Sequence, residues 1–294
     1  MINKQDKKLN FLSHIILIAL SALIILPFII LLSASFSGEK AIAHTGYSVL
    51  PKAITLDAYK YVFKNPKTII DAYGVTIFVS TVYTVLSTFL MALLAYPLTK
   101  STMKGRNAIN FYVYFTMLFS GGLVPSYILI TQYLHLNDTI WVYILPGLVS
   151  PWYVFMMRTF FKGIPGEISE SAYVDGANEY IIFFRIIIPL SKPVIATVAL
   201  MMFLTKWNDW MTSMLYVNNE SLMSLQYQLQ RIMQNIQLLQ SNESEAQNLV
   251  NIKDIPGETA RMAMAVVAAG PALIIFPFFQ KYFVKGLTVG SVKG

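Results

Sequence analysis

Long apolar stretches constrain the fold of this chain more than any other feature of its sequence. Crossing the hydrocarbon core of a bilayer takes about 20 mostly apolar residues in a helix. The stretches that meet this requirement cover residues 11–35, 72–98, 108–130, 139–157, 192–217 and 259–282. Because a backbone in lipid must satisfy its own hydrogen bonds, we predict an all-α, polytopic membrane protein. It should have six transmembrane helices in a single domain over residues 1–294.

Composition and charge agree with a membrane location. Charged residues make up 13% of the chain and hydrophobic residues 55%, whereas about 25% of the residues in a typical soluble domain are charged. The chain has no cysteine, which excludes a disulfide framework, and His14, His44 and His135 lie too far apart in sequence to predict a metal site. The net charge of +7 is explained by inner loops that face anionic lipid, so no nucleic-acid partner is expected.

The distribution of Lys and Arg predicts the orientation of the spans. With the N-terminus in the cytoplasm, the inner segments carry more of these residues than the outer loops, as the positive-inside rule requires. The lysine-rich first outer loop runs against this bias, and an interfacial helix over residues 55–65 would account for several of its lysines. The first apolar stretch exceeds the core of about 7–15 residues in a signal peptide, so we expect it to remain as a span. The prediction is a multi-pass protein of the cell membrane with both termini in the cytoplasm.

A charged loop over residues 163–191 separates the fourth and fifth predicted spans and would lie in the cytoplasm. The dipeptide Asp175-Gly176 indicates a turn or a helix cap, since glycine readily takes a left-handed conformation. Asn178 is placed to cap a second helix, so the loop is predicted to form a helix–turn–helix. The residues alone leave two roles open, a helix lying on the lipid surface or a docking surface for a cytoplasmic protein.

A motif within this loop carries a family resemblance. The stretch ESAYVDGANEYIIFFRIIIPL, residues 170–190, resembles the EAA loop of the permease subunits of bacterial ABC importers. The signature of that loop is Glu-Ala-Ala, three residues, Gly, nine residues, Ile, one residue and Leu-Pro. The spacing matches throughout, with Ser171 in place of the first alanine and Ile188 in place of leucine. The Asp-Gly-Ala and Pro-Leu steps at 175–177 and 189–190 extend the match to the sugar-transporting branch.

The resemblance covers nearly the whole chain. Six spans with this loop between the fourth and fifth are similar to a maltose-type permease subunit, and the segments 119–125 and 280–286 resemble a subgroup associated with oligosaccharide and polysaccharide-fragment uptake. The chain is thereby identified as a member of the binding-protein-dependent, maltose-type carbohydrate uptake family. The resemblance implies that the loop is a coupling helix seated in a cleft of an ATPase subunit. The residues that it assigns to coupling are Glu170, Ser171, Ala172, Asp175, Gly176, Ala177 and Pro189.

The expected function is that of a pore subunit, not an enzyme: ATP-driven import of an oligosaccharide, delivered by an extracytoplasmic binding protein, by alternating access. No Gly-x-x-x-x-Gly-Lys-Ser/Thr phosphate loop occurs in the sequence, so ATP and Mg would be bound by a partner ATPase and no cofactor by this chain. The resemblance implies a second homologous permease subunit, two ATP-binding cassette subunits and an extracytoplasmic sugar-binding protein, besides the lipid bilayer. The alternatives are an ABC permease for a non-sugar solute and a secondary transporter, which should show internal repeats and an ion site.

Polar groups within the second and fifth spans are candidates for the substrate pathway. They are Thr84, Thr88, Trp207, Asn208 and Asp209. Ionisable groups in a span are costly and usually face a cavity or each other, so Asp209 either contacts sugar or pairs with Lys206 at i,i+3. The two threonines either line the pore or allow close helix packing. No catalytic residue and no metal ligand is predicted.

The long loop over residues 218–258 is predicted to lie outside the cell. Leucines and isoleucines repeat by threes and fours over residues 222–239, which predicts an amphipathic helix on the protein's own outer surface. Loops as long as the acidic segment that follows are usually functional or disordered. The resemblance implies that this segment reaches into the sugar-binding protein through Glu243, Glu245 and Asp254. A passive surface loop is the alternative.

Overall fold

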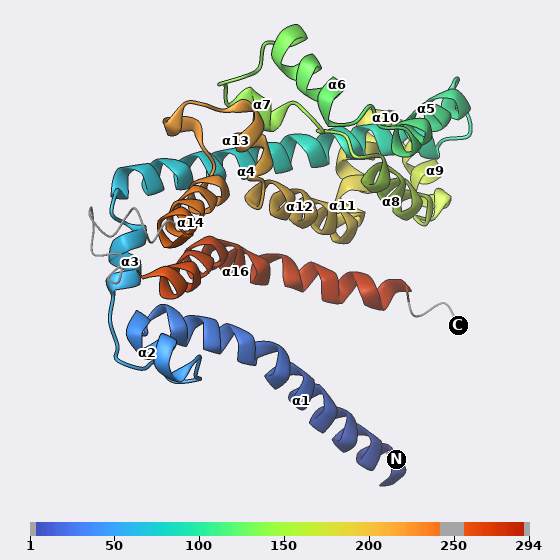
Figure 1. Cartoon of the computed structure of the whole chain (residues 1–294). Coiled ribbons are helices and arrows are strands. Elements are labelled where there is room, and N and C mark those ends of the chain that lie inside the picture. The colour runs from blue at the N-terminus through green and yellow to red at the C-terminus, as the bar shows by residue number, and fades with distance from the viewer. Residues whose placement is uncertain (1–3, 242–255, 291–294) are drawn as a thin grey trace. The chain divides into compact units, whose positions relative to one another are not determined.

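The computed structural model describes residues 4–241 and 256–290 of the chain (Figure 1). All regular structure in these ranges is helical, which confirms the predicted all-α class. Over the described residues the chain divides into two compact units, Met1–Lys67 with Leu229–Pro271 and Thr68–Gln228 with Ala272–Gly294. We call them unit 1 and unit 2 and describe each by itself.

The helical elements differ widely in length. The α-helices are α1 (Lys4–Ser35), α2 (Glu39–Thr45), α3 (Asp57–Val62), α4 (Pro66–Ala95), α5 (Arg106–Leu118), α6 (Leu123–Ile128), α7 (Trp141–Ile144), α8 (Pro151–Lys162), α9 (Gly166–Val174), α10 (Glu179–Ile182), α11 (Ile188–Leu190), α12 (Lys192–Trp207), α13 (Met211–Tyr216), α14 (Leu225–Ser241) and α16 (Gly257–Gly290). Short 3-10 helices, η1 (Pro97–Thr99) and η4 (Glu220–Leu222), and π-helical turns, η2 (Leu129–Tyr133) and η3 (Phe183–Ile187), connect or extend them. The amphipathic helix predicted over residues 222–239 is α14.

Three helices are long and apolar enough to cross a membrane on their own, Asn10–Ser35, Pro66–Thr99 and Gly257–Pro277. They correspond to the first, second and sixth predicted spans. Two further helix pairs qualify only as bent pairs. These are Arg106–Leu118 with Leu123–Tyr133, bent by 113°, and Glu179–Leu190 with Lys192–Trp207, bent by 79°. The described residues therefore contain up to five candidate spans by length and composition, and the count of six stays a prediction.

Glycines and polar residues break the remaining apolar stretches. Gly122 has φ +86° and Gly147 has φ +74°, a left-handed conformation that glycine takes without strain. The first lies between α5 and α6, and the second between α7 and α8. The predicted fifth span stops at Trp207 and resumes at Met211. Hydropathy averaged over a stretch does not detect such breaks, because the residues on both sides are apolar.

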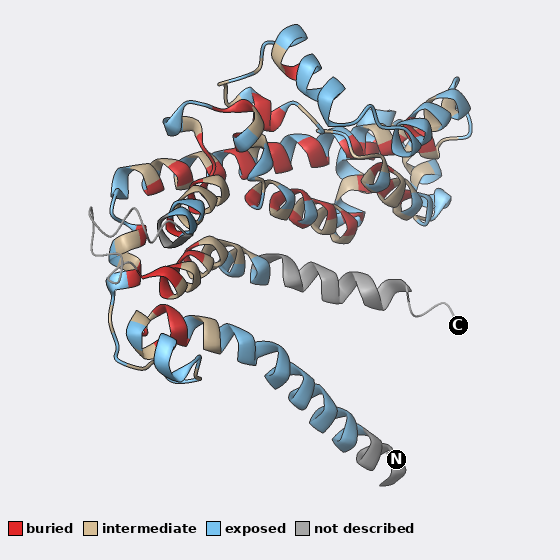
Figure 2. Cartoon of the chain, viewed as in Figure 1, coloured by how far each residue is buried: buried red, intermediate tan, exposed pale blue. Residues whose placement is uncertain are grey.

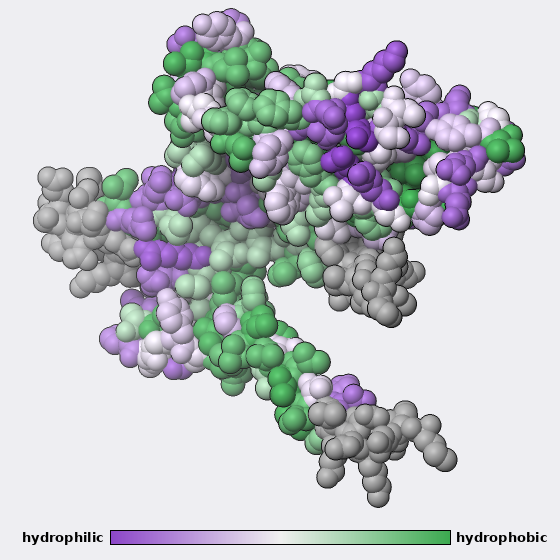
Figure 3. Space-filling view, turned by 90° about the vertical axis from the view of Figure 1, so that its right-hand side faces the viewer, coloured by the Kyte–Doolittle hydropathy of each residue, from purple (hydrophilic) through white to green (hydrophobic). Residues whose placement is uncertain are grey.

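Unit 1 contains the N-terminal helix and a small folded region that follows it. The apolar side chains of α1, such as Phe11 and Leu23, are exposed along the helix (Figures 2 and 3), as expected where lipid is the solvent. Tyr59 of α3 shares a hydrogen bond of 2.9 Å with Ser35 at the end of α1. Its ring also lies 5.0 Å from the ring of Phe36. These contacts fix α3, which falls within the predicted interfacial segment 55–65, against the end of α1.

A carboxylate from α2 caps the start of α16 within unit 1. Glu39 accepts hydrogen bonds from the backbone N–H groups of Glu258 and Thr259, each at 2.9 Å, and from the Thr259 hydroxyl at 2.7 Å. The first N–H groups of a helix have no partner within the helix, and the helix dipole favours a negative charge beside them. The start of α16 is therefore anchored to α2.

Unit 2 is organised around α4. One core cluster forms where the end of α4 meets α8, α12 and the loop between them; its fully buried members include Met91, Ala95, Leu98, Val154, Met157, Ile182 and Val198. A second cluster joins the first half of α4 to α7 and α13 through Val79, Tyr143 and Tyr216. The Thr76 hydroxyl of α4 also accepts a hydrogen bond of 2.8 Å from the backbone N–H of Leu225. Both clusters thus use one long helix as their common support.

Candidate functional site

The loop 163–191 folds into the predicted helix–turn–helix. After α9 the chain turns at Asp175 and Gly176, and the glycine has φ +81°. The Asn178 side chain accepts a hydrogen bond of 2.9 Å from the backbone N–H of Ile181, which confirms the predicted cap of the second helix. The sequence was informative here because a turn and a cap are set by neighbouring residues.

The predicted coupling residues are mostly exposed. Glu170, Ser171, Asp175, Gly176 and Pro189 are exposed, whereas Ala172 and Ala177 are half-buried. The two alanines pack against the core cluster at the end of α4, and α9 buries none of its residues. The small side chains therefore seat the loop on unit 2, and its polar side chains are free to meet another molecule. The coupling role of these residues stays a prediction.

Two exposed apolar side chains lie on either side of the turn. Val174 is 88% exposed and Tyr180 is 76% exposed. The sequence analysis did not select them, although Val174 directly precedes the Asp-Gly turn. The loop consequently presents apolar contact area as well as charge.

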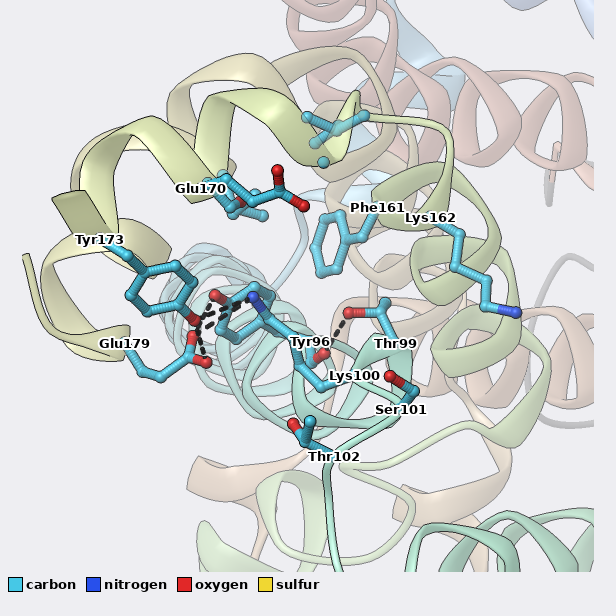
Figure 4. Close-up of a pocket in the computed structure, with 14 residues that line it drawn as sticks. Tyr96, Thr99, Lys100, Ser101, Thr102, Phe161, Lys162, Glu170, Tyr173 and Glu179 are labelled. Carbon is cyan, nitrogen blue, oxygen red and sulfur yellow. Dashed lines mark hydrogen bonds and ion pairs between the residues drawn. The ribbon is translucent and has the colours of Figure 1, made fainter.

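Three side chains meet at the carboxylate of Glu179, and we call these four residues together the Glu179 cluster (Figure 4). Tyr96, at the end of α4, donates to Oε2 at 2.5 Å, and Tyr173 of α9 donates to Oε1. Lys100 Nζ lies 3.5 Å from Oε2 and 3.3 Å from the Tyr173 hydroxyl oxygen. The same ammonium lies 5.0 Å from the ring centre of Tyr96 and 5.5 Å from that of Tyr173, within the range of cation–π attraction.

The charges in this cluster favour the observed hydrogen bonds. Burial, the hydrogen bond to Glu179 and the negative charge of that residue raise the pKa of Tyr173 to about 12, so its hydroxyl keeps its proton at physiological pH. Burial by itself would raise the pKa of Glu179. The hydrogen bonds from Tyr173 and Tyr96 and the charge of Lys100 outweigh burial, and the pKa of Glu179 lies below its usual range. An ionised carboxylate thus faces protonated donors.

Sequence reasoning missed this cluster because its members are distant in the chain. Tyr96 and Glu179 are separated by 83 positions, and Lys100 and Tyr173 by 73. Neither pair follows a helical or strand spacing. A tyrosine and a lysine near the end of a predicted span, such as Tyr96 and Lys100, are also expected at any membrane interface, so no local signal set them apart.

A cavity of about 600 Å³ opens beside the Glu179 cluster. Figure 4 shows Glu170 on one side of it, with Phe161 and Lys162 of α8 opposite. Thr99, Ser101 and Thr102 line a further part of the wall. The cavity therefore places the exposed Glu170 beside a polar hollow with room for side chains of a docked molecule.

The break between α12 and α13 holds the second group of predicted site residues. Lys206 Nζ lies 3.0 Å from Asp209 Oδ2, and the two side chains are only 9% and 15% exposed. Asp209 also accepts from the Thr212 backbone N–H at 3.0 Å and from the Thr212 hydroxyl at 2.7 Å. Of the two alternatives for Asp209, the structure contains the i,i+3 pair with Lys206, and Asp209 additionally caps the first turn of α13.

The neighbours of Asp209 differ in their accessibility. Trp207 is buried and stacks on Phe203, with ring centres 5.7 Å apart. Asn208 is exposed; its amide donates to the Leu204 carbonyl at 2.8 Å. The indole is therefore part of the core of unit 2, whereas Asn208 is exposed and its amide oxygen accepts a hydrogen bond of 3.4 Å from Gln226.

Tyr83 connects α4 to this break. Its hydroxyl donates to the Gly147 carbonyl at 2.5 Å, and its ring lies 4.7 Å from Lys206 Nζ. Thr84, which directly follows Tyr83, and Thr88, one turn after Thr84, are both buried, and the Thr84 hydroxyl donates to the Ser80 carbonyl at 2.6 Å. This placement is the one that close helix packing requires, and pore lining by the two threonines stays a prediction.

Asp138 organises the connection between η2 and α7 by contacting the end of α13. Its carboxylate accepts from the backbone N–H groups of Asn219 at 2.9 Å and Asn218 at 2.5 Å. The Asp138 N–H in turn donates to the Tyr216 carbonyl at 2.9 Å. The two backbone hydrogen bonds hold the pKa of Asp138 below its usual range. The sequence analysis did not identify this contact.

The predicted contact residues for the binding protein, Glu243, Glu245 and Asp254, lie outside the described residues. Among the residues that the structure describes, no group of three or more His, Cys, Asp or Glu side chains is arranged to hold a metal ion.

A helical fold with several long apolar helices defines a polytopic membrane protein. Residues 73–289 match the family described as the inner membrane component of binding-protein-dependent transport systems. The chain belongs to this family, which confirms the resemblance inferred from the loop motif.

Individual relatives match over nearly the full length of the chain. It is 42% identical to protein LplC of Bacillus subtilis over 273 residues, which cover 93% of this chain and 90% of that protein. It is 37% identical over 290 residues to the polygalacturonan/rhamnogalacturonan transport system permease protein YtcP of Bacillus subtilis, over 99% of this chain and 100% of that protein. The crystal structure of a bacterial ABC transporter involved in the import of the acidic polysaccharide alginate contains a chain with a TM-score of 0.78 and 29% identity. That likeness covers 96% of this chain and 99% of that one.

Proposed function

We propose that this permease subunit translocates an oligosaccharide or polysaccharide fragment that an extracytoplasmic binding protein delivers. The names of its relatives support a saccharide cargo. One relative transports polygalacturonan and rhamnogalacturonan, and the structural relative imports alginate. A third, the arabinooligosaccharides permease AraQ of Bacillus subtilis, is 30% identical over 94% of this chain. A non-sugar cargo carried by the same type of permease is the alternative.

The observation that supports an ATP-driven importer is the exposure of the loop 163–191, which offers a docking surface for an ATPase. Glu170 and Asp175 are exposed on it, Val174 adds apolar area, and the cavity of about 600 Å³ opens beside Glu170. This combination of charge, apolar contact and a hollow is what a protein docking surface needs, which favours docking over a helix lying on lipid. We therefore assign the loop to a cytoplasmic ATPase that binds ATP and Mg, while this chain forms the pore.

The assembly that follows contains this chain, a second homologous permease subunit, two ATPase subunits and the binding protein. Six spans with both termini in the cytoplasm place the loop 163–191 on the ATPase side. The same topology places the segment 218–258 outside, where Glu243, Glu245 and Asp254 would contact the binding protein. The bias of Lys and Arg toward the inner segments supports this orientation.

Within the pathway we assign sugar contact to Asn208. Its side chain is exposed at the break between α12 and α13, and amides hydrogen-bond well to hydroxyl groups. Asp209 is engaged by Lys206 and Thr212, so its role is to hold the break open. Trp207 is buried and supports the wall of the pathway from within the core of unit 2.

The test is reconstitution of the purified complex in proteoliposomes that contain the ATPase. We expect the binding protein loaded with an oligosaccharide to stimulate ATP hydrolysis and to support ATP-dependent uptake of labelled sugar. Asn208→Ala should lower uptake more than it lowers binding-protein-stimulated hydrolysis. Thr205→Ala, an exposed neighbour on α12, is the control. Uptake that is independent of ATP, or stimulation by amino acids but not by any saccharide, would contradict the proposal.

The outer segment can be tested in the same assay. Replacing residues 243–255 with a short Gly/Ser linker should leave basal ATP hydrolysis intact, because the coupling loop lies on the opposite face in the predicted topology. Stimulation by the loaded binding protein should fall, and uptake with it. Equal stimulation of the parent and the shortened protein would identify the segment as a passive surface loop.

A further inference from the structure

We infer that the Glu179 cluster is the mechanical link through which the loop 163–191 moves α4, an inference that rests on the proposed docking of an ATPase to this loop. The cluster joins three elements at one carboxylate (Figure 4). Tyr96 directly follows α4, and Lys100 directly follows η1, the short helix that comes next in the chain; Tyr173 belongs to α9, and Glu179 is the first residue of α10. Both arms of the helix–turn–helix are thereby tied to the segment that directly follows α4.

The burial of apolar side chains cannot by itself connect α9 to the rest of unit 2. The whole of α9 lies in the described part of the chain, and the helix buries none of its residues. Its apolar attachment to the core of unit 2 consists of half-buried side chains such as Ala172. A force applied to the exposed surface of α9 must therefore reach unit 2 largely through polar contacts, and the hydrogen bond from Tyr173 to Glu179 is placed to carry it.

The chemistry of the cluster makes it stiff. Hydrogen bonds to an ionised carboxylate are stronger and shorter than those between neutral groups, and tyrosine holds its hydroxyl on a ring with few rotatable bonds. Lys100 lies near the rings of Tyr96 and Tyr173 as well as Glu179, so the three elements cannot separate without breaking several contacts at once. The Glu179 side chain is 50% exposed, which leaves the ion pair with Lys100 as the weaker part of the link.

The other end of the link is a rigid helix that reaches the pathway. Tyr83 and Tyr96 lie 13 positions apart on or directly after α4, which corresponds to about 20 Å along a helix. Tyr83 contacts Lys206 at the break in the fifth predicted span. The loop is also continuous in sequence with α12 through α11. It can therefore drive two helices together, α12 through the chain itself and α4 through the Glu179 cluster.

Loss of the cluster should uncouple ATP hydrolysis from transport. In Glu179→Ala and in the double variant Tyr96→Phe/Tyr173→Phe, the loop would still engage the ATPase and move α12, but α4 would follow incompletely. We expect a several-fold rise in the number of ATP molecules hydrolysed per sugar imported. The ratio is the informative readout, because a residue with a purely structural role would change assembly, or both rates in proportion, and leave the ratio unchanged.

Matched controls come from the same region. Tyr112→Phe removes a hydroxyl from an exposed tyrosine of α5, and Lys104→Gln removes a charge from an exposed lysine near Lys100. Both residues lie outside the Glu179 cluster, so their variants should keep the parental ratio. Lys100→Gln should raise the ratio less than Glu179→Ala does, since the hydrogen bonds from the tyrosines remain.

The experiment uses the complete reconstituted importer, with co-purification of the ATPase as the check on assembly. Should Glu179→Ala fail to assemble, Tyr173→Phe tests the same link with the loss of a single oxygen atom. A parental ATP-to-sugar ratio in assembled Tyr173→Phe and in the double variant would overturn the inference. Failure of the proposed function would look different, because the parent itself would then show no ATP-dependent uptake of sugar.

Discussion

Replacing Asp209 tests how the break between α12 and α13 is held. Its carboxylate is 15% exposed and accepts three hydrogen bonds, one from Lys206 and two from Thr212. Removing one partner of a buried ion pair costs about 3–5 kcal/mol, chiefly because the other charge is left buried and unpaired. Because both groups keep some exposure to solvent, we expect Asp209→Ala to lower the free energy of unfolding by about 3 kcal/mol, the lower limit of this range.

The same reasoning ranks three further variants. Asp209→Asn keeps an acceptor for the Thr212 N–H but removes the carboxylate that pairs with Lys206. We expect this variant to lower the free energy of unfolding by about 2 kcal/mol. The double variant Lys206→Met/Asp209→Asn removes the uncompensated charge, and its loss should fall to about 1 kcal/mol. Thr205→Ala changes an exposed residue of the same helix and should cost within about 0.5 kcal/mol.

The assay is the apparent unfolding temperature of the purified complex in detergent. For a domain of about 150–250 residues, 1 kcal/mol corresponds to about 2–4 °C, and on this scale Asp209→Ala should unfold about 6–12 °C below the parent. The order of the variants matters more than the absolute shifts. If the double variant proves as unstable as Asp209→Ala, the pair does not act as a unit and the assignment of Asp209 to the break is wrong.

Three other predictions follow from contacts described above. Glu39→Ala removes the cap of α16 and should lower the free energy of unfolding by about 0.5–2 kcal/mol. Amide hydrogen exchange at Thr259 should then accelerate. An exchange rate equal to that of the parent would show that the cap is dispensable. The folded-state pKa of Asp138 is depressed, so its stabilisation is present above the ordinary aspartate value and is lost as pH falls through the lower folded value. Amide hydrogen exchange at Asn219 should therefore accelerate at acid pH, and this acceleration should be absent in Asp138→Asn. An acceleration that persists in Asp138→Asn would exclude Asp138 as its source. Gly176→Pro cannot adopt φ +81° and removes a backbone donor, so ATPase co-purification and uptake should both fail while membrane insertion remains; normal uptake would remove this loop from the coupling machinery.

Local features of this chain were predictable from the sequence. The apolar stretches predicted the helical class because lipid leaves a spanning backbone few alternatives. The turn at Gly176 and the cap by Asn178 follow from preferences of single residues, and both are present. The pair of Lys206 and Asp209 follows from the geometry of one helix turn, and Lys206 Nζ lies 3.0 Å from Asp209 Oδ2.

Contacts between distant segments were not predictable. The Glu179 cluster depends on how the end of α4 packs against α9, which no spacing in a single sequence encodes. The break before α6 had a signal, the glycines at 121–122, but the apolar residues on both sides concealed it. Asp209 also had an overlooked signal, since an aspartate three residues before Thr212 fits a helix cap.

The absence of buried residues in α9 has a consequence for the history of this protein. A helix that has no fully buried side chain and only Ala172 packed against the core can accept substitutions at its exposed positions without unfolding what lies beneath it. Selection on its outward surface is then separated from selection on the rest of the subunit. A permease built in this way can adapt to a different motor by changes confined to one short helix, while the specificity of its pore is inherited intact.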